Sequence, residues 1–375
     1  MKRWVEGVLR CPVCGSELDI AIFEGSEVEI SEGILLCQCH RWYPIIRGIP
    51  RMLWGEHRED YSHFLTTHKQ DTSKYLKSEY FQQATTSEQV RGTFATIWDR
   101  FPSFGINDEK KQSFYDKWMA QKLGLNSTNE LYHYLSSKKK ILEVGIGSGQ
   151  KLKMMAEHTK GQIIGIDLTS SVQHAFNNTK EMANVAVVQA DLFALPFKKN
   201  SFDFIISDGV LHHTPDTKQA FLSIVPFLSK GGEIAIRVYR KTGPIREFCD
   251  DFIRSYTTKM SEAECWEFCE KMARLGEFLA KTGFQIKIPE DIEVLGFKKG
   301  RYDFQRFVYY NMFKCFYNEA FTFDENVLVN FDWYRPIDAH RHTEEEVRQW
   351  FIEAKLSEIQ IFNPESGISA IGEKV

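Results

Sequence analysis

The sequence lacks three features that would place it in a simple class. No apolar run is long enough to cross a membrane, and the first residues, 1–7, lead into no apolar segment of the kind a secretory signal needs. There is no excess of one charge, since the formal net charge over 375 residues is -4. We therefore expect a cytoplasmic globular protein with one large domain and an appendage, no membrane partner, and a charge that argues against nucleic acid as partner.

A glycine is also absent where one class of cofactor loop requires it. Residues 140–149 read Lys-Ile-Leu-Glu-Val-Gly-Ile-Gly-Ser-Gly, a short apolar run followed by a glycine loop that opens a helix. The dinucleotide fingerprint needs a glycine five positions after Gly145, where this sequence has Gln150. The carboxylate of Glu143 would either order the loop amides or face a cationic ligand. Both features favour S-adenosylmethionine, which carries a sulfonium and no pyrophosphate.

Two later apolar segments also end in an acid. Residues 162–167 end in Asp167, 22 residues beyond the first glycine of the loop, which is the position of a ribose-hydroxyl ligand. Residues 185–192 include Asp191, which is placed to hold an adenine amino group. The alternative is that both acids are ordinary helix caps or loop residues and that the glycines form a tight turn without a ligand.

In this order the segments resemble the motifs of class I S-adenosylmethionine-dependent methyltransferases, over roughly residues 138 to 240. A fourth strand is expected at 201–207, and Ser207-Asp-Gly-Val-Leu-His-His213 follows it. Leu228-Ser-Lys-Gly-Gly232 then precedes a fifth strand at 233–239. One glycine loop would be weak support, but several motifs in order are strong.

The resemblance implies an α/β fold with a Rossmann-like sheet, parallel except for a terminal antiparallel hairpin at 358–362 and 368–371. Ligands of such sheets lie at the carboxyl ends of the strands. The residues expected to hold S-adenosylmethionine there are Glu143, Gly145, Ile146, Gly147, Gly149, Asp167, Leu168, Asp191, Leu192 and Ser207.

Methyl transfer from a sulfonium needs an oriented, deprotonated acceptor rather than a covalent intermediate. His212 and His213 follow the fourth strand, and histidine suits proton removal from a hydroxyl or amine. Asp208 is a second candidate, and a histidine that only shapes the pocket is the alternative. Before the first strand, residues 93–102 would form a helical lid with Arg100 near the methionine carboxylate, or an aromatic stripe used for packing alone.

Four of the eight cysteines lie near the N-terminus, as the pairs Cys11 and Cys14, and Cys37 and Cys39. In a cytosolic chain such thiols are read first as metal ligands, and four thiolates would close a tetrahedral structural Zn²⁺ site. A unit this small has little hydrophobic core. The metal would therefore supply much of its folding free energy.

Residues 41–53 and the first cysteine pair are similar to the small zinc-binding activator subunits of tRNA and translation-factor methyltransferases, here fused to the enzyme. The second pair departs from that pattern, because one residue rather than two separates its cysteines. His40 is therefore an alternative ligand, although the distance back from Tyr43 favours Cys39. A ribbon that holds no metal is the other alternative.

Residues 244–340 do not continue the alternation of strands and helices. An amphipathic helix is expected over 244–281, and aromatic residues then concentrate between Tyr302 and Tyr334. They would line a pocket for an apolar or planar substrate, or build a larger core. The candidates for substrate binding, through a carboxylate or phosphate, are Trp333, Tyr334, Arg335, His340 and Arg341, with a solvated charged turn as the alternative.

The expected domains are a zinc-ribbon-like domain (1–54), a linker and helical lid (55–137), a methyltransferase core (138–243), a helical, aromatic-rich insertion (244–340), and a closing helix and hairpin (341–375). The first hypothesis for function is methyl transfer to a small, partly apolar molecule. One alternative is an RNA or protein methyltransferase that binds its substrate through the zinc module. Another is a non-methylating scaffold protein or a nicotinamide oxidoreductase on the same fold.

Overall fold

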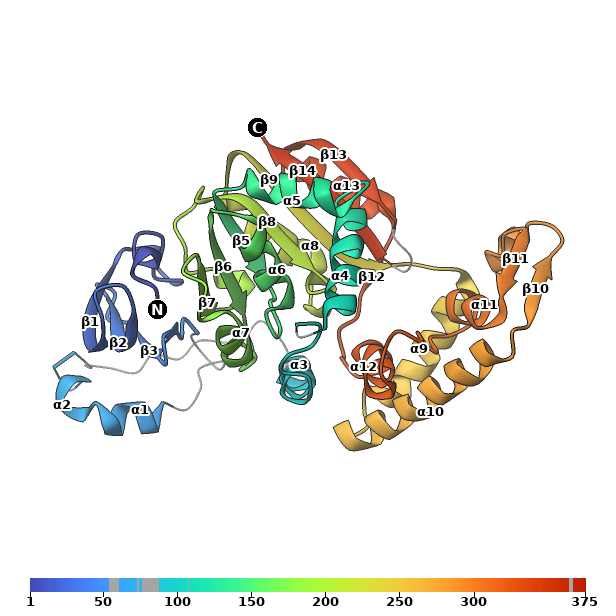
Figure 1. Cartoon of the computed structure of the whole chain (residues 1–375), viewed down its shortest axis with the longest axis horizontal. Coiled ribbons are helices and arrows are strands. Elements are labelled where there is room, and N and C mark those ends of the chain that lie inside the picture. Colours follow the sequence, from blue (N-terminus) through green and yellow to red (C-terminus); the bar gives the residue numbers. More distant parts are fainter. Residues whose placement is uncertain (54–60, 73, 76–87, 107, 364–366) are drawn as a thin grey trace. The chain divides into compact units, whose positions relative to one another are not determined.

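The computed structural model describes residues 1–53, 61–72, 74–75, 88–106, 108–363 and 367–375 (Figure 1). Its internal contacts divide the chain into two compact units. The first unit holds Met1–Val238 with Glu344–Pro364 and Ser369–Val375, and the second holds Tyr239–Thr343 with Glu365–Ile368. None of the described helices is both long enough and apolar enough to span a membrane.

The first unit is built on a sheet with the strand order β13-β14-β9-β8-β5-β6-β7. Its five central strands run parallel, and the last two form an antiparallel hairpin. This topology confirms the predicted Rossmann-like fold. The strands are β5 (Lys140–Val144), β6 (Gln162–Asp167), β7 (Val185–Gln189), β8 (Phe202–Asp208), β9 (Leu228–Arg240), β13 (Leu356–Phe362) and β14 (Gly367–Lys374).

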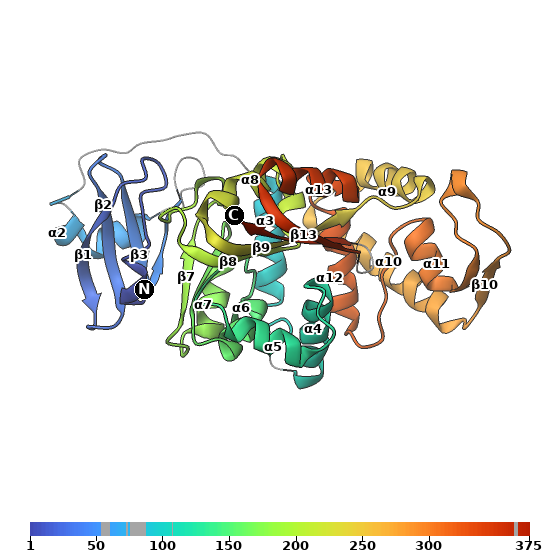
Figure 2. The ribbon, with the colours of Figure 1, turned by 90° about the horizontal axis from the view of Figure 1, so that it is seen from above.

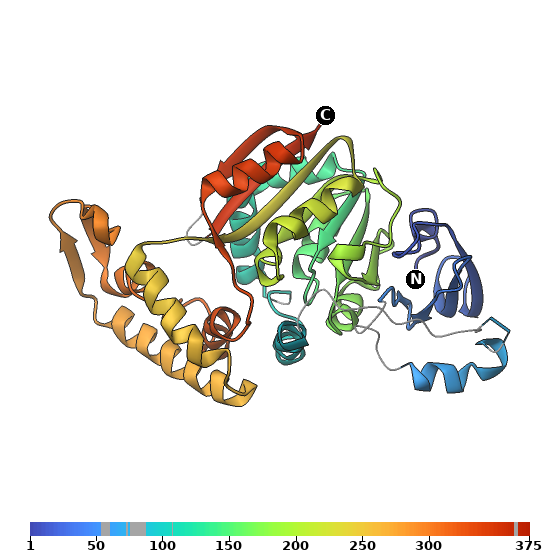
Figure 3. The same cartoon turned by 180° about the vertical axis from the view of Figure 1, so that it is seen from behind.

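Helices cover both faces of this sheet, which is why the central strands are apolar almost throughout. All five residues of β7 are buried. Helices α5, α6 and α7 lie over one face, and α8 and α13 lie over the other (Figures 2 and 3). The helices are α5 (Thr128–Ser136), α6 (Gln150–His158), α7 (Val172–Thr179), α8 (Thr217–Ile224) and α13 (Glu344–Glu353), with 3-10 turns η3 (Leu192–Ala194), η4 (Leu211–His213) and η5 (Val225–Phe227).

A small antiparallel sheet precedes the core, with the strand order β1-β2-β3-β4. Main-chain contacts join this small sheet to the edge strand β7. Arg51 forms a parallel β-bridge with Gln189, and the Met52 N–H donates to the Gln189 carbonyl at 2.8 Å. The Arg51 guanidinium also donates to Gln189 Oε1 at 2.9 Å. The elements here are η1 (Arg3–Val5), β1 (Leu18–Gly25), β2 (Ile30–Cys37), β3 (Trp42–Ile46), β4 (Ile49–Pro50), α1 (Ser62–Thr67) and α2 (Lys69–Thr72).

Two further helices, α3 (Glu88–Arg100) and α4 (Glu109–Lys122), precede β5. Helix α3 occupies most of the segment expected to form a lid. Helix α4 leads through a short turn into α5, and Ser127 caps α5 by accepting a hydrogen bond from the Glu130 N–H. Buried residues of α4 and α5, such as Met119 and Leu131, join the same core cluster as the sheet.

The second unit is mostly helical. The single helix expected over 244–281 is in fact two, because Ser261 forms a capping box with Glu264 and starts a new helix. The short strand β12 pairs in parallel with the end of β9. The elements are α9 (Pro244–Thr257), α10 (Glu262–Lys281), β10 (Gln285–Ile288), η6 (Glu293–Leu295), β11 (Gly300–Asp303), α11 (Phe304–Asn311), α12 (Phe323–Tyr334) and β12 (Arg341–His342).

Candidate functional site

The glycine loop after β5 has a backbone that only glycine adopts without strain. Gly145, Gly147 and Gly149 have φ values of 79°, 52° and 85°. A Cβ atom on Gly147 would lie 2.5 Å from the Trp98 ring, and one on Gly145 would lie 2.3 Å from the Val210 side chain. The loop therefore turns tightly between α3 and the segment that follows β8. Ile146, also predicted to be part of the site, is buried here.

Asp167, at the end of β6, holds the loop in place. Its Oδ2 atom accepts a hydrogen bond from the Gly147 N–H at 3.0 Å, and its Oδ1 atom accepts from the Thr169 N–H and hydroxyl at 2.9 and 2.8 Å. Ordering of the loop amides was one of the two roles expected of Glu143. The structure gives that role to Asp167, because the parallel neighbour β6 places its last residue beside the loop.

Glu143 is a buried carboxylate with unfilled acceptor positions. Its side chain is 1% exposed, and among the described residues neither carboxylate oxygen has a hydrogen-bond partner. The pKa of Glu143 is raised from 4.5 to about 8, first by burial and to a smaller extent by Asp208 and Asp167, while Lys151, 3.9 Å away, opposes the shift. A buried carboxylate without a hydrogen-bond donor among the described residues fits a cationic ligand, which was the second expected role of Glu143.

The remaining predicted cofactor residues end the neighbouring strands. Asp191 caps η3, where its carboxylate accepts from the Phe193 N–H at 2.9 Å. The Ser207 hydroxyl, on β8, donates to the Val144 carbonyl of β5 at 3.3 Å. The Leu168 carbonyl accepts from Gln189 Nε2 at 3.3 Å, and Leu192 is buried in η3. These contacts place the predicted residues along one edge of the sheet, from β8 to β7.

His212 and His213 lie in η4, directly after β8, and both are buried. Their ring centroids are 4.3 Å apart, and the Phe94 ring of α3 meets His213 edge-on at 4.8 Å. With Trp98 against Gly147, helix α3 therefore contacts both the glycine loop and the histidine turn. Arg100 lies exposed at the end of this helix. Its contact with the cofactor stays a prediction.

Sequence reasoning missed most of the charges around Asp208. The Lys122 ammonium, from α4, donates to Asp208 Oδ2 at 2.6 Å, while Lys151 Nζ lies 3.7 Å from Oδ2 and Arg237 Nη1 lies 4.0 Å from Oδ1. Burial alone would raise the pKa of Asp208, but these three cations hold it below its usual range. Asp208 is therefore ionised and already paired, which makes it a weak candidate for the general base. In the sequence, the feature that pointed to this cluster is Arg237, a charged residue in the middle of the apolar run 234–239.

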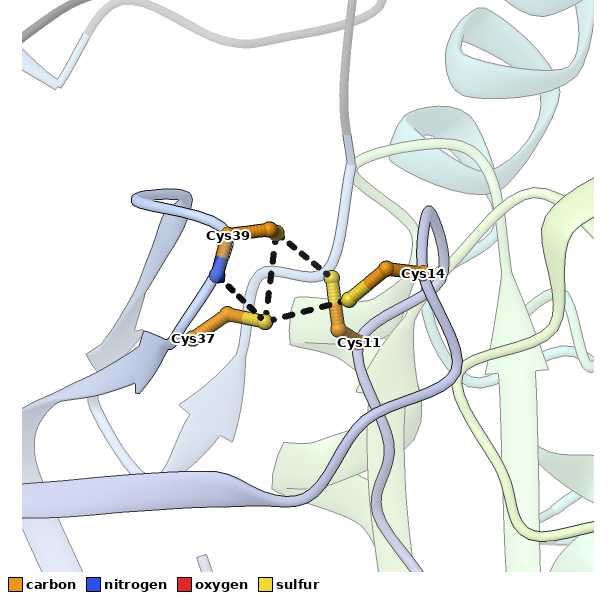
Figure 4. A group of neighbouring side chains, drawn as sticks. All are labelled: Cys11, Cys14, Cys37 and Cys39. Atoms are coloured by element: carbon orange, nitrogen blue, oxygen red, sulfur yellow. Dashed lines mark hydrogen bonds between the residues drawn. The ribbon is translucent and has the colours of Figure 1, made fainter.

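The four N-terminal cysteines come together at one end of the small sheet (Figure 4). Their Sγ atoms all lie within 4.8 Å of one another, with Cys11 to Cys39 at 3.7 Å and Cys14 to Cys37 at 3.3 Å. Tetrahedral zinc with bonds of ~2.3 Å to sulfur sets sulfur atoms ~3.8 Å apart, so the group fits this ion. His40 is exposed, and the group consists of the four cysteines alone among the described residues.

The predicted substrate residues of the second unit are largely part of its interior. Trp333 and Tyr334 are buried, and the Tyr334 hydroxyl donates to the Lys314 carbonyl at 2.7 Å. Arg335 donates to the Thr258 carbonyl at 3.1 Å. Arg341 pairs with Glu247 at 3.0 Å and also with Asp251, and His340 lies 3.8 Å from Asp338. Their role in substrate binding stays a prediction.

Comparison with known proteins agrees with the geometry. Residues 142–236, from β5 into β9, match a family model described as a methyltransferase domain. Together with the sheet topology and the strand-end residues, this match defines a class I S-adenosylmethionine-dependent methyltransferase domain.

Curated relatives resemble the same part of the chain. Phosphoethanolamine N-methyltransferase 2 of Caenorhabditis elegans is 28% identical over 147 residues, which are 38% of this chain and 32% of the relative. A ubiquinone/menaquinone biosynthesis C-methyltransferase of Wigglesworthia glossinidia brevipalpis is 28% identical over 149 residues, 38% of this chain and 56% of the relative. A tRNA U34 carboxymethyltransferase of Aliarcobacter butzleri is 28% identical over 170 residues, 44% and 53% of the two chains. The chain therefore spans only about a third to just over half of the length of these relatives.

Proposed function

We propose that this chain transfers a methyl group from S-adenosylmethionine to a small, partly apolar molecule. The observation that carries the proposal is the buried carboxylate of Glu143, which has no hydrogen-bond partner among the described residues and lies beside a glycine loop covered by Trp98. The amino group of the cofactor would supply the missing donors. One of the relatives named above is named for phosphoethanolamine, and another for ubiquinone and menaquinone biosynthesis.

The residues of the site would divide the work between binding and proton transfer. Bound S-adenosylmethionine would supply an electrophilic methyl group on its sulfonium. Glu143 and Asp167 would bind the cofactor at two neighbouring strand ends, and the α3 residues Phe94 and Trp98 would exclude water from it. His213 would accept the proton of a hydroxyl or amine acceptor, because it follows β8 and lies against Phe94.

The test of this function compares acceptor classes. Purified full-length chain with labelled S-adenosylmethionine is offered small hydroxyl, amine and carbon acceptors, bulk tRNA and ribosomal RNA, and a protein extract. We expect turnover on one class of small acceptors, and a fall of ~10²-fold or more in His213→Ala. Turnover confined to RNA or protein would refute the proposal.

The RNA arm tests a second candidate function. A relative named as a tRNA U34 carboxymethyltransferase favours it, and so does the resemblance of the N-terminal sheet to activator subunits of macromolecule methyltransferases. Under this alternative the small sheet would bind the substrate. Removing the metal from the sheet would then abolish RNA methylation while cofactor binding persisted.

We also propose a structural zinc ion held by Cys11, Cys14, Cys37 and Cys39. Metal analysis of purified protein should give one zinc per chain. Cys39→Ser should lower this content, whereas the neighbouring control His40→Ala should leave it unchanged. If His40→Ala lost the metal and Cys39→Ser kept it, the assignment of the fourth ligand would be wrong.

A further inference from the structure

Beside the proposed cofactor site lies a cluster of cations that exceeds its carboxylates, in which Lys122 is buried and Lys151 and Arg237 are partly buried. Lys122, Lys151 and Arg237 surround the single ionised group Asp208. The other nearby carboxyl, Glu143, is mostly protonated at neutral pH because burial raises its pKa to about 8. Burial lowers the pKa of Lys122 to about 7, so at neutral pH this ammonium is only partly charged. Lys151 and Arg237 still exceed the single charge of Asp208, in a place where the side chains of Lys122 and Arg237 are 6% and 11% exposed. Buried charge without a counter-ion is costly, so an additional anion would be stabilised here.

The cations of this cluster are only partly paired. Lys122 donates to Asp208 at 2.6 Å, but the Lys151 and Arg237 contacts with carboxylates are 3.7 to 4.0 Å long, beyond hydrogen-bond length. Within the described part of the chain, the buried Nε atom of Arg237 has no hydrogen-bond partner. Lys151 is the most accessible of the three, with 26% of its side chain exposed. Donors are thus available, and the accessible side of the cluster is at Lys151.

An aromatic wall closes the cluster. The Lys122 ammonium lies 3.2 Å from the centroid of the Trp118 ring, and the Arg237 guanidinium carbon lies 5.2 Å from it. Both cations are therefore held in place by the same flat ring. A preorganised set of donors binds an anion with little cost in side-chain entropy.

The sheet order places Asp208 and Arg237 on the side of β5 opposite the residues that would hold the ribose and adenine. Asp208 and Arg237 are register partners on β8 and β9, whereas Asp167 ends β6 and Asp191 follows β7, on the other side of β5. The histidine turn η4 follows β8 directly. An anion beside Arg237 would therefore lie next to the turn that contains His212 and away from the residues that would hold the ribose and adenine.

We propose that Lys122, Lys151 and Arg237 form a subsite for an anionic group, a carboxylate or phosphate, of the methyl acceptor. The proposal rests on the methyltransferase function proposed above and narrows its substrate to a small molecule that has an anionic end. The carboxylate of the cofactor itself is a second group that would fit these three cations. Phosphate titrations with and without bound cofactor distinguish the two.

The test titrates inorganic phosphate and acetate calorimetrically into the full chain, alone and saturated with S-adenosylhomocysteine. We expect phosphate to bind in both arms, and to bind at least tenfold more weakly in Lys151→Met and in Arg237→Met. The affinity for S-adenosylhomocysteine should change less than threefold in Arg237→Met; Lys151→Met is left out of this readout, because Lys151 lies 3.9 Å from Glu143. Arg237→Lys should recover part of the phosphate affinity, and Lys153→Met, two positions along α6, is the matched control that should bind as the wild type does.

Three results would overturn the assignment. If S-adenosylhomocysteine displaced phosphate, or if its own affinity fell tenfold in Arg237→Met, the anion would be the carboxylate of the cofactor. If phosphate failed to bind the wild type in either arm, the cluster would be a closed ion network. The variant Lys122→Met alone would leave Asp208 buried without its partner. Lys122 is therefore tested in the double variant Lys122→Met, Asp208→Asn, and unchanged phosphate affinity in that variant would also contradict the proposal. Failure of the wild type to bind S-adenosylhomocysteine would instead refute the proposed function, and phosphate binding would still be read from the cofactor-free arm.

Discussion

The core sheet of the first unit and helix α9 of the second unit differ in where they place their charged residues. In the core sheet, strands such as β7 are buried throughout, and the charged residues lie at or near strand ends, where the candidate site is. In the second unit, α9 buries Arg246, Asp250 and Arg254 and leaves the rings of Phe248 and Phe252 74% and 58% exposed. Burial along the core strands thus follows hydrophobicity except near the strand ends, whereas burial in α9 follows hydrogen bonding.

The physical reason for the difference is the number of backbone carbonyls that are available to accept hydrogen bonds from buried side chains. Arg246 donates to Asp250 and to the Tyr309 carbonyl, and Arg254 donates to the carbonyls of Trp333 and Pro336. Those carbonyls belong to helix ends and loops, whose acceptors are not used within a helix. Strands of a sheet use their own carbonyls in the ladder, so they offer buried side chains fewer acceptors.

The largest expected effect is on the buried pair of α9. Arg246→Met should lower the free energy of unfolding by about 3 to 5 kcal/mol, because it leaves the Asp250 carboxylate buried without its counter-ion. Thermal unfolding followed by calorimetry measures the change. The control is Arg274→Met, since Arg274 belongs to an ion pair on α10 whose side chain is 61% exposed, and it should cost less than ~0.5 kcal/mol.

The next effect concerns the glycine loop. Gly147→Ala should weaken S-adenosylhomocysteine binding by about 2 to 3 kcal/mol, because a Cβ atom there meets the Trp98 ring at 2.5 Å and the backbone is left-handed. Gly209→Ala is the matched control, since its φ is also positive but no atom lies within 4 Å. Equal losses in the two variants would mean that α3 does not lie over the loop.

Glu143 gives an effect that depends on pH. Its folded pKa is raised from 4.5 to about 8, so the unfolded chain loses the proton first and the contribution of Glu143 to stability falls as pH rises from about 4.5 to about 8. Glu143→Gln should remove that fall, which is on the order of 3 to 4 kcal/mol between pH 5 and pH 8, and should make the cofactor-free protein more stable at pH 8. Chemical denaturation at pH 5 and pH 8 compares the two proteins. An unchanged pH slope would show that Glu143 is solvated.

The smallest effect is predicted for the exposed aromatic residues of α9. Phe248→Ser should change the free energy of unfolding by less than ~0.5 kcal/mol, because the ring is already 74% exposed. A loss above ~2 kcal/mol would mean that this face of the helix is covered.

The sequence predicted the core well because each of its motifs is local. Asp167 and Asp191 each end an apolar run, and parallel strands bring such ends to one edge. The ion cluster was not predictable in this way, since Lys122 and Asp208 are 86 positions apart and meet only through the packing of α4. In the second unit, helical periodicity gave the helices but hid the break at Ser261, where capping outweighs the apolar pattern.

The most direct measurement is calorimetric titration of S-adenosylhomocysteine into the full chain at pH 7, in buffers of different ionisation enthalpy. We predict one site per chain and release of close to one proton, because a bound ammonium would ionise Glu143. Asp167→Ala should weaken binding by about 1.5 to 3 kcal/mol, since it removes a charged acceptor. Absence of binding, or binding without proton release and indifferent to Asp167, would contradict the claim that this strand-end edge is a cofactor site.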